Sequence, residues 1–422
     1  MASTLTTFDP FLKRYYNPGQ VTALVNKDRP FLAKIKKTMG SGNLWVTPVI
    51  FANPQGLSAD LVNAQLASNQ AGAGGNLQGK QWQSTWGDYT GAVSIGDKVI
   101  AASRDNVGAF FENQKAEIDR LYEQFADIMG LYSIGDSGHS VTPGTFTISS
   151  GVCTLVVPDD IVNIQVGMVL QASANPGTST SDALIDPSLG YVIAVNENTG
   201  VFTISATSGG SAGTPANWTG TMYAFRNGDF GGTATPTRIM LGLSAWVPAA
   251  DPSATSFEGV VRTAGITALS GVRLTAAEIA GVGIEQRIKK LVTRMVGRAK
   301  GPGPSDVFLN PEKWQALADS LESRGTRPLD GKIGTFNYQK VQLAAGGKMV
   351  DIWADRFCPL GRAFAVNFDY IEMKTLSGFP AVVNGDGLTM LRKTTSNDYE
   401  HRLVSYPAFQ VKAPGYQGTT AV

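Results

Sequence analysis

The sequence predicts an α+β protein organised around one long helix, with an extended hairpin before the helix and a small all-β domain inserted after it. Helical spacing of apolar residues over 103–135, strand-like stretches around a long uncharged segment, and a Thr-, Ser- and Gly-rich block support this prediction. The expected order is an N-terminal arm 1–40, an extended hairpin 41–100, the long helix 101–140, the inserted domain 141–228, mixed helices and strands 229–330, and a strand-rich end 331–422.

The N-terminal 40 residues form a basic segment with seven Lys or Arg residues against Asp9 and Asp28. Prolines interrupt it, which leaves room for short helices at Gln20–Asn26 and Phe31–Lys37. Three interpretations remain: an ordinary solvated segment, an arm clamped to a neighbouring subunit, or a basic face toward nucleic acid.

Two strand-like stretches, Leu44–Phe51 and Gln81–Asp88, predict a long hairpin, and Val93–Ile100 continues in an extended pattern. The connecting residues 52–80 are almost uncharged. Alternation places Trp82, Ser84 and Trp86 on one face. Because an isolated hairpin is marginally stable in water, this face needs a surface, either the core of the same chain or a neighbour.

Apolar residues recur with helical spacing from Ser103 to Gly135, interrupted only at Gln114. They are Val107, Phe110, Phe111, Ile118, Leu121, Tyr122, Phe125, Ile128, Met129 and Tyr132. Ser103 or Asp105 can cap the start and Gly135 can end the helix. About 28 residues would span roughly 42 Å. This helix is either the core of a large domain or the spine of a shell-forming subunit.

The block 141–228 contains several short strand-like runs separated by turn signals, which is typical of a small barrel or sandwich. The expected strands are Thr145–Ser149, Cys153–Val157, Met168–Ala172, Tyr191–Asn196, Val201–Ser205 and Met222–Arg226.

The remaining chain predicts loops with a strand over 229–275, followed by helices and then strands. A capping box at Thr275–Glu278 opens a helix that runs to about Lys300. A strand at Asp306–Leu309 and a helix from Pro311 to Glu322 follow, with Asn310 as the cap. The later strands are expected at Gln339–Leu343, Val350–Ala354, Ala363–Val366, Ile371–Lys374 and His401–Lys412.

Composition and motifs favour a structural protein over an enzyme. Charged residues make up 16% of the 422 residues, against about 25% in typical globular domains, which suggests a surface covered by neighbours. No nucleophile, metal or phosphate-loop motif is present. The sequence therefore predicts no catalytic residue, no cofactor, no metal and no membrane span.

A few residues remain as weak candidates for chemistry. His139 and His401 are the only histidines, and a lone histidine is more often structural than catalytic. Cys153 and Cys358 fall in different expected domains, so a disulfide is not predicted. The other candidates are a cation contact at Asp159–Asp160, a dinucleotide loop at Ala71–Gly75 and a basic helix face over 287–300.

The order of these parts resembles the major capsid proteins of tailed bacteriophages, which have the Hong Kong 97-type coat fold. The matching stretches are DRPFLAKIKK (28–37), the helix 103–135, DVFLNPEKWQALADSL (306–321) and VDIWADRFCPLGRAFAVNFDYIEM (350–373). The resemblance covers most of the chain outside 141–228.

The resemblance implies an N-arm and an extended hairpin that reach over neighbours, a peripheral domain with the long spine helix, and an axial domain built by the later strands. It implies an icosahedral shell of hexamers and pentamers around double-stranded DNA, assembled in the host cytoplasm and found in the virion. Scaffolding, portal and decoration proteins are further candidate partners. Some members crosslink through Lys and Asn, for which Lys80 is a conceivable donor.

Two alternatives remain at this point. An encapsulin-like compartment would share the fold and enclose an enzyme cargo. A monomeric glycan-binding protein built around 141–228 would belong to a different class.

Overall fold

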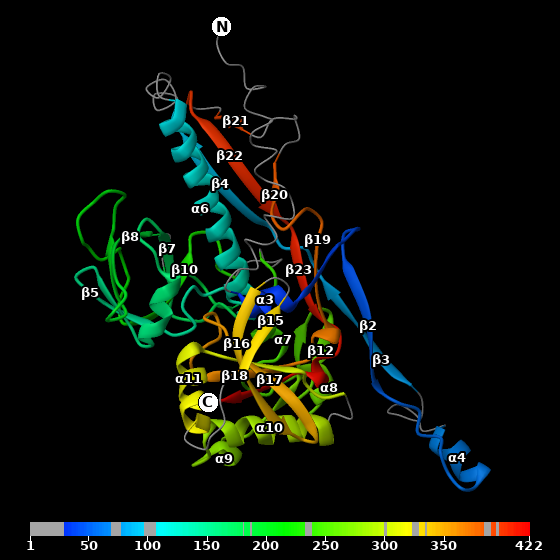
Figure 1. Ribbon diagram of the computed structural model, residues 1–422. Coiled ribbons are helices and arrows are strands. Elements are labelled where there is room, and N and C mark those ends of the chain that lie inside the picture. The colour runs from blue at the N-terminus through cyan, green and yellow to red at the C-terminus, as the bar shows by residue number, and fades with distance from the viewer. Residues whose placement is uncertain are drawn as a thin grey trace.

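The computed structural model describes residues 29–68, 77–96, 107–179, 181–185, 188–232, 239–298, 302–322, 329–333, 336–383, 390–393 and 396–422. Its helices, with 3-10 turns labelled η, are α3 (Pro30–Lys34), α4 (Leu61–Ser68), α6 (Val107–Ile134), η2 (Pro158–Asn163), α7 (Leu243–Trp246), α8 (Thr267–Ser270), α9 (Ala276–Ile279), α10 (Ile284–Arg298), α11 (Pro311–Glu322), η3 (Phe368–Tyr370) and η4 (Pro414–Tyr416). Figure 1 shows their arrangement and confirms a mixed α+β protein.

The strands fall into a barrel and several sheets. They are β1 (Lys36–Met39), β2 (Trp45–Ala52), β3 (Gln78–Ser84), β4 (Tyr89–Ile95), β5 (Phe146–Ser149), β6 (Val152–Leu155), β7 (Val169–Ser173), β8 (Gly190–Asn196), β9 (Val201–Ser205), β10 (Thr221–Arg226), β11 (Thr255–Phe257), β12 (Val260–Arg262), β13 (Val272–Arg273), β14 (Asp306–Leu309), β15 (Leu329–Ile333), β16 (Phe336–Ala345), β17 (Lys348–Ala354), β18 (Arg362–Val366), β19 (Ile371–Thr375), β20 (Ala381–Val382), β21 (Leu391–Arg392), β22 (Tyr399–Ser405), β23 (Pro407–Val411) and β24 (Gly418–Ala421).

The long helix α6 has 28 residues, as its apolar spacing predicts. From Ile118 to Ile134 its apolar side chains are buried in the largest core of the chain. Gly135 ends the helix and donates its backbone N–H to the Leu131 carbonyl at 2.9 Å. The predicted caps Ser103 and Asp105 lie outside the described residues.

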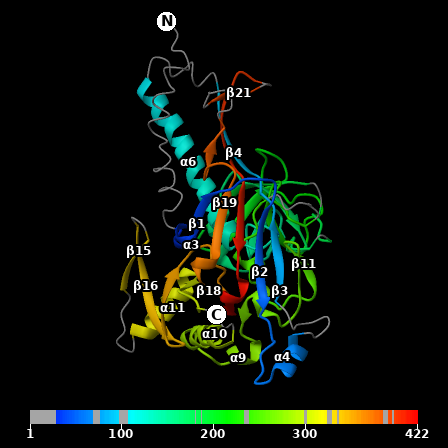
Figure 2. The same ribbon diagram turned by 90° about the vertical axis from the view of Figure 1, so that its right-hand side faces the viewer.

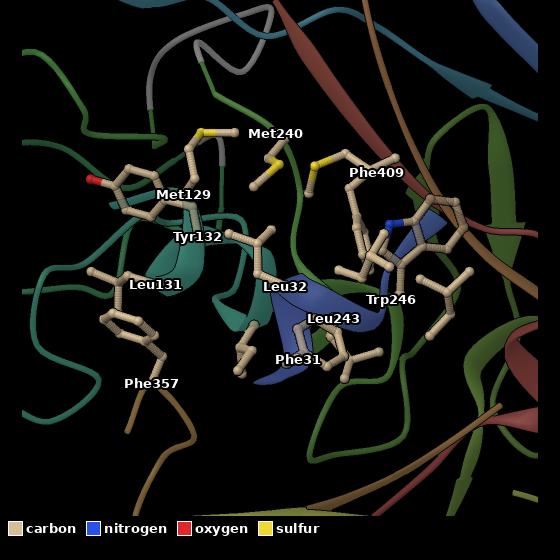
Figure 3. Packing of buried hydrophobic residues seen from close by; sticks show 14 of the residues in the cluster. Phe31, Leu32, Met129, Leu131, Tyr132, Met240, Leu243, Trp246, Phe357 and Phe409 are labelled. Atoms are coloured by element: carbon tan, nitrogen blue, oxygen red, sulfur yellow. The ribbon is translucent and has the colours of Figure 1, made fainter. Parts of the chain in front are cut away.

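The end of the expected arm is built into the same core, which corrects the predicted helix Phe31–Lys37. Helix α3 stops at Lys34, and β1 then pairs in parallel with β19. Figure 3 shows Phe31 and Leu32 of α3 lying among the side chains of α6 and α7. Residues 36–39 form a strand and do not continue helix α3, because β19 provides hydrogen-bond partners for their backbone. Residues 1–28, with the helix predicted at Gln20–Asn26, lie outside the described residues.

The hairpin consists of β2 and β3, which pair antiparallel from Trp45↔Ser84 outward. Figures 1 and 2 show it projecting from the body, with α4 at its far end. Helix α4 was not predicted, because LVNAQLAS lacks a clear polar face. Strand β4 does not continue the hairpin: it pairs along its length with β22, about 300 residues later in the sequence.

The six strands expected in 141–228 form a closed barrel in the order β10-β5-β6-β9-β8-β7. Its interior is a separate apolar cluster that includes Phe146, Phe202 and Trp218. Gly138 and Gly231 lie where the chain enters and leaves the barrel, and each approaches backbone so closely that a Cβ there would collide with a carbonyl oxygen. The barrel is therefore joined to the body by two tightly packed segments.

A seven-stranded sheet, β13-β24-β18-β14-β17-β16-β15, carries α10 and α11 on a second core. The capping box at Thr275 is present, but the predicted single helix is two: α9 ends at Ile279 and α10 begins at Ile284. Gly281, with φ +66°, separates them. The predicted strand His401–Lys412 is also two strands, because β22 and β23 enter different sheets on either side of Tyr406.

Candidate assembly surface

The root of the hairpin, where β2 and β3 leave the body, is fixed by one buried tryptophan. Trp82 is 0% exposed. Its ring packs edge-on against Trp246 of α7, with ring centroids 5.0 Å apart, and lies 6.4 Å from Phe257 of β11. The face predicted to carry Trp82 and Ser84 therefore lies on the core of its own chain.

A chain of polar side chains joins both strands of the root to the body. The Thr47 hydroxyl donates to Gln410 Oε1 at 2.6 Å, and Gln410 Nε2 donates to the Ser84 hydroxyl oxygen at 3.2 Å. Gln410 is fully buried, so these bonds satisfy polar groups that water does not reach.

On the opposite face of the hairpin, β2 presents apolar side chains that the described chain leaves uncovered, whereas β3 presents Gln81 and Gln83. On β2, Trp45 and Val49 point into the body, while Val46 and Ile50 point outward and Ile50 is 59% exposed. A strand with apolar residues on both faces is typical of one that is covered on both sides. The outward face therefore has the character of an interface.

The tip continues this apolar surface. Leu57 is 87% exposed, and Leu61, Val62 and Leu66 of α4 are all exposed. Helix α4 buries none of its residues and contains no charged side chain. Among the described residues, half of the strongly exposed large apolar side chains lie between residues 44 and 77. Such concentration on one projecting element marks an interaction site.

Residues 29–34, at the end of the expected arm, are anchored by ion pairs to α6 and to the seven-stranded sheet. Asp127 of α6 accepts from Arg29 and from Arg356, and Lys34 pairs with Asp306. The Phe31 backbone N–H donates to the buried Asp355 carboxylate at 3.0 Å. Burial raises the pKa of Asp355 to about 6, although these hydrogen bonds favour its charged form. The C-terminal end of the expected arm is therefore held at a fixed position on the body.

The two histidines are both buried and lie in different places. His401 is on β22. His139 is in the segment that enters the barrel, where its Nε2 lies 3.1 Å from the Met240 carbonyl oxygen and its ring packs edge-on against Tyr132. Burial lowers the pKa of His139 below its usual 6.5. The contacts of this ring thus join the entry segment to Met240 and to α6.

We expect acid to weaken the junction between barrel and body through His139. A histidine with a lowered folded-state pKa stabilises the fold above about pH 6.5, and this contribution is lost as the pH falls below that value. The thermal midpoint of the wild type should therefore fall between about pH 6.5 and pH 5, and the fall should be smaller in His139→Gln. Equal falls in both proteins, measured by circular dichroism, would contradict this role.

The structure places three of the other weak candidates, the two cysteines and Asp160, in buried surroundings. Cys153 and Cys358 are both free and buried, and burial raises the pKa of each thiol, that of Cys153 to about 12. The buried Asp160 carboxylate accepts from the Gly144 backbone N–H at 2.8 Å, which ties η2 to the first barrel strand. Lys80 is the third residue of β3, opposite Val49. The segment Ala71–Gly75 lies outside the described residues.

Four of the basic residues predicted to face nucleic acid on α10 are engaged within the chain. Arg287 donates to the Val282 and Ala421 carbonyls, and Lys290 donates to the Glu278 carbonyl. Lys289 pairs with Glu285, and Arg294 pairs with Glu278. A role for this helix at DNA remains a prediction.

The described ranges hold no group of three or more His, Cys, Asp or Glu residues that could bind a metal ion. No helix within them combines the length and apolar character that crossing a membrane requires.

The chain is similar to several solved shell structures. No family model and no curated protein matches the sequence. A cyanophage A-1(L) capsid structure matches with 10% identity and a TM-score of 0.44, over 93% of this chain and 92% of that one. The capsid of a native GTA particle matches with 8% identity and a TM-score of 0.42, over 95% and 90%. A virus-like particle from Pyrococcus furiosus matches with 8% identity and a TM-score of 0.38, over 95% and 96%.

Proposed function

We propose that this chain is a major capsid protein that assembles with copies of itself into an icosahedral shell enclosing the double-stranded DNA of a tailed phage. In the Hong Kong 97-type fold, β2–β3 would be the extended loop, α6 the spine of the peripheral domain, and the later strands part of the axial domain. The barrel would be an insertion, and the protein would reside in the virion. One observation carries the proposal: the outward side chains Val46 and Ile50 of β2 and those of the tip helix are apolar and exposed, while the other face of the hairpin is packed on the body.

The geometry of the hairpin favours a repeating contact between copies. An extension that lies on a different surface of the next copy makes a head-to-tail interface, and such interfaces form rings or larger assemblies. Each hairpin buries only a moderate area, so shell stability would come from many contacts acting together. The rigid root and the anchored arm would hold the angle at which each hairpin leaves its subunit.

Electron microscopy of the purified protein tests the proposal. We expect closed particles of uniform size by negative staining, and particles from infected cells should contain DNA. Light scattering that finds only a 44.6 kDa monomer under all assembly conditions would contradict the proposal. Closed particles that contain a protein cargo and no DNA would instead support the compartment alternative.

A further inference from the structure

One face of the three-stranded sheet β1-β19-β23 gathers three lysines around one buried carboxylate. The register of β1 and β19, which lie side by side in Figure 2, places Lys36 beside Glu372. Lys374 is two residues further along β19, so it lies on the same face. Lys412 follows β23 and pairs with Glu372 at 2.6 Å, and the Thr38 hydroxyl donates to the same carboxylate at 2.9 Å. We call Lys36, Lys374 and Lys412 the lysine face.

The lysine face points away from the core, and part of it is open within the described chain. On the other side of the same strands, Met373 and Phe409 are buried in the largest core. The hairpin root covers β23, where Gln410 is fully buried beneath Thr47. Beside it Lys36 is exposed, and the side chain of Lys412 is 40% exposed. A partner can therefore reach these ammonium groups.

The contacts within the lysine face position its charges and leave a positive excess. Lys374 Nζ lies 4.6 Å from the centroid of the Trp45 ring. Although burial opposes it, hydrogen bonds from Lys412 and Thr38 hold the pKa of Glu372 below its usual value of 4.5, so this carboxylate stays ionised. Three lysines against one glutamate give this face of the sheet a net charge of +2.

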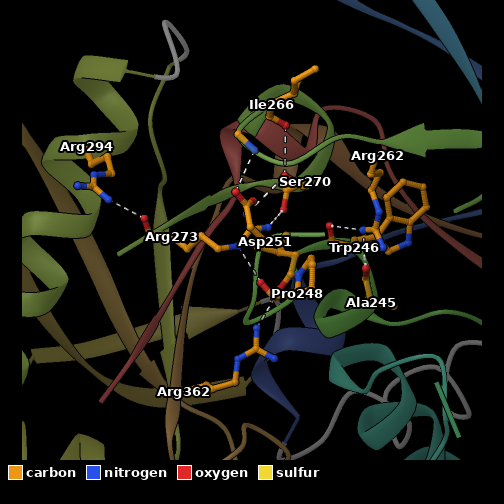
Figure 4. A network of polar contacts seen from close by, with 12 residues as sticks. Ala245, Trp246, Pro248, Asp251, Arg262, Ile266, Ser270, Arg273, Arg294 and Arg362 are labelled. Carbon is orange, nitrogen blue, oxygen red and sulfur yellow. Dashed lines mark hydrogen bonds and ion pairs between the residues drawn. The ribbon is translucent and has the colours of Figure 1, made fainter. Parts of the chain in front are cut away.

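The arginines beside α7 are used differently, because the chain itself occupies their donors. Four of them, from β12, β13, α10 and β18, donate to backbone carbonyls, mainly those of residues 245–248 (Figure 4): Arg262, Arg273, Arg294 and Arg362. These bonds stabilise the fold. A lysine ammonium at an open surface is instead a compact point charge, which suits phosphate oxygens.

We propose that the lysine face contacts the phosphates of the enclosed double-stranded DNA, which assigns this face of sheet β1-β19-β23 to the inside of the shell. The inference rests on the proposed function. Strand geometry places the three lysine Cα atoms on the order of 10 Å apart, so each ammonium can meet a separate phosphate of a duplex. Such contacts neutralise charge without reading sequence. The hairpin that would reach a neighbouring copy is a poor match for this face, because residues 52–80 are almost uncharged.

The salt dependence of DNA binding tests the lysine face. The measurement uses the full chain as unassembled subunits, verified by light scattering, and follows the fluorescence anisotropy of a labelled DNA duplex. Each phosphate contact contributes about 0.9 to the slope of log affinity against log salt concentration. Replacing Lys36, Lys374 and Lys412 together by glutamine should therefore lower the slope by about 2 to 3, equally for duplexes of different sequence. Lys36→Gln alone should lower it by about 1.

Two further variants separate the lysine face from a general loss of charge or of folding. Replacing Lys80, Lys313 and Lys348 by glutamine removes the same charge from other elements and should keep the wild-type slope. Arginine at the three positions of the lysine face should also keep it, because the charge is retained. A wild-type slope in the triple glutamine variant, or an equal fall in the control, would overturn the proposal.

Particle formation by the same proteins tests the proposed function separately. The triple glutamine variant should form particles as the wild type does. If it keeps the wild-type slope but forms no particles, the lysine face meets a second copy and not DNA. If the wild type binds DNA through these lysines but never forms particles, the shell is contradicted while the phosphate contact stands.

Discussion

Replacing Leu61, Val62 and Leu66 by glutamine should prevent particle formation while leaving the subunit folded. The three side chains are exposed on α4, where the body gives them no contact, so their loss costs the isolated subunit little. If the tip is buried on a second copy, each side chain contributes roughly 1.5–3 kcal/mol to every contact. Since about 1.4 kcal/mol is tenfold in affinity, the triple variant should assemble at least a hundredfold more weakly.

The measurement compares light scattering and negative-stain images with far-ultraviolet circular dichroism of the same samples. Glutamine is chosen because its helix propensity is close to that of leucine, so α4 itself should persist. A matched control is Val156→Gln with Val166→Gln, two exposed apolar residues on the barrel, which should assemble normally. Normal particles from the tip variant would mean that the apolar tip is not the assembly contact.

Local patterns predicted the long helix and the barrel well. Helix α6 was predicted because its stripe of apolar residues is regular over many turns. The barrel strands were predicted because each is short and bounded by turn residues, as at 198–200 before β9. In both cases neighbouring residues carry the information, and tertiary contacts only complete it.

Features set by distant pairing could not be predicted in the same way. The extended pattern near β4 was recognised, but its pairing with β22 could not be predicted. The residues around Val93 carry no signal that Val93 will lie opposite His401. Docking of the arm depends on Phe31 reaching Asp355, which lies 324 residues later. Such contacts between distant residues depend on how the whole core packs, so a single sequence carries no direct signal for them.

The candidate site was predicted only in part. Alternation on β3 showed that Trp82 and Ser84 share a face, but left open whether that face meets its own core or a neighbour. The exposed tip helix was missed because its few apolar residues give no amphipathic contrast.

Trp82→Ala should be among the most destabilising single substitutions in this chain. Trp82 is fully buried at the root and packs against Trp246 and Phe257, so alanine leaves a cavity between β3, α7 and β11. Truncating a buried tryptophan typically costs about 3–5 kcal/mol. Denaturant unfolding should show this loss, and the β2 and β3 amides should lose protection before those of α6.

Val46→Ala on the outer face of the same hairpin is the matched control. Its side chain is exposed in the subunit, so the free energy of unfolding should change by less than about 0.5 kcal/mol. If the outer face is an interface, however, this variant should weaken assembly although its fold is intact. The two substitutions therefore separate the two faces of one hairpin: the Trp82 face holds the hairpin to its subunit, and the Val46 face is left for a neighbour. Equal stability losses for both variants would mean that the hairpin does not have two functionally distinct faces.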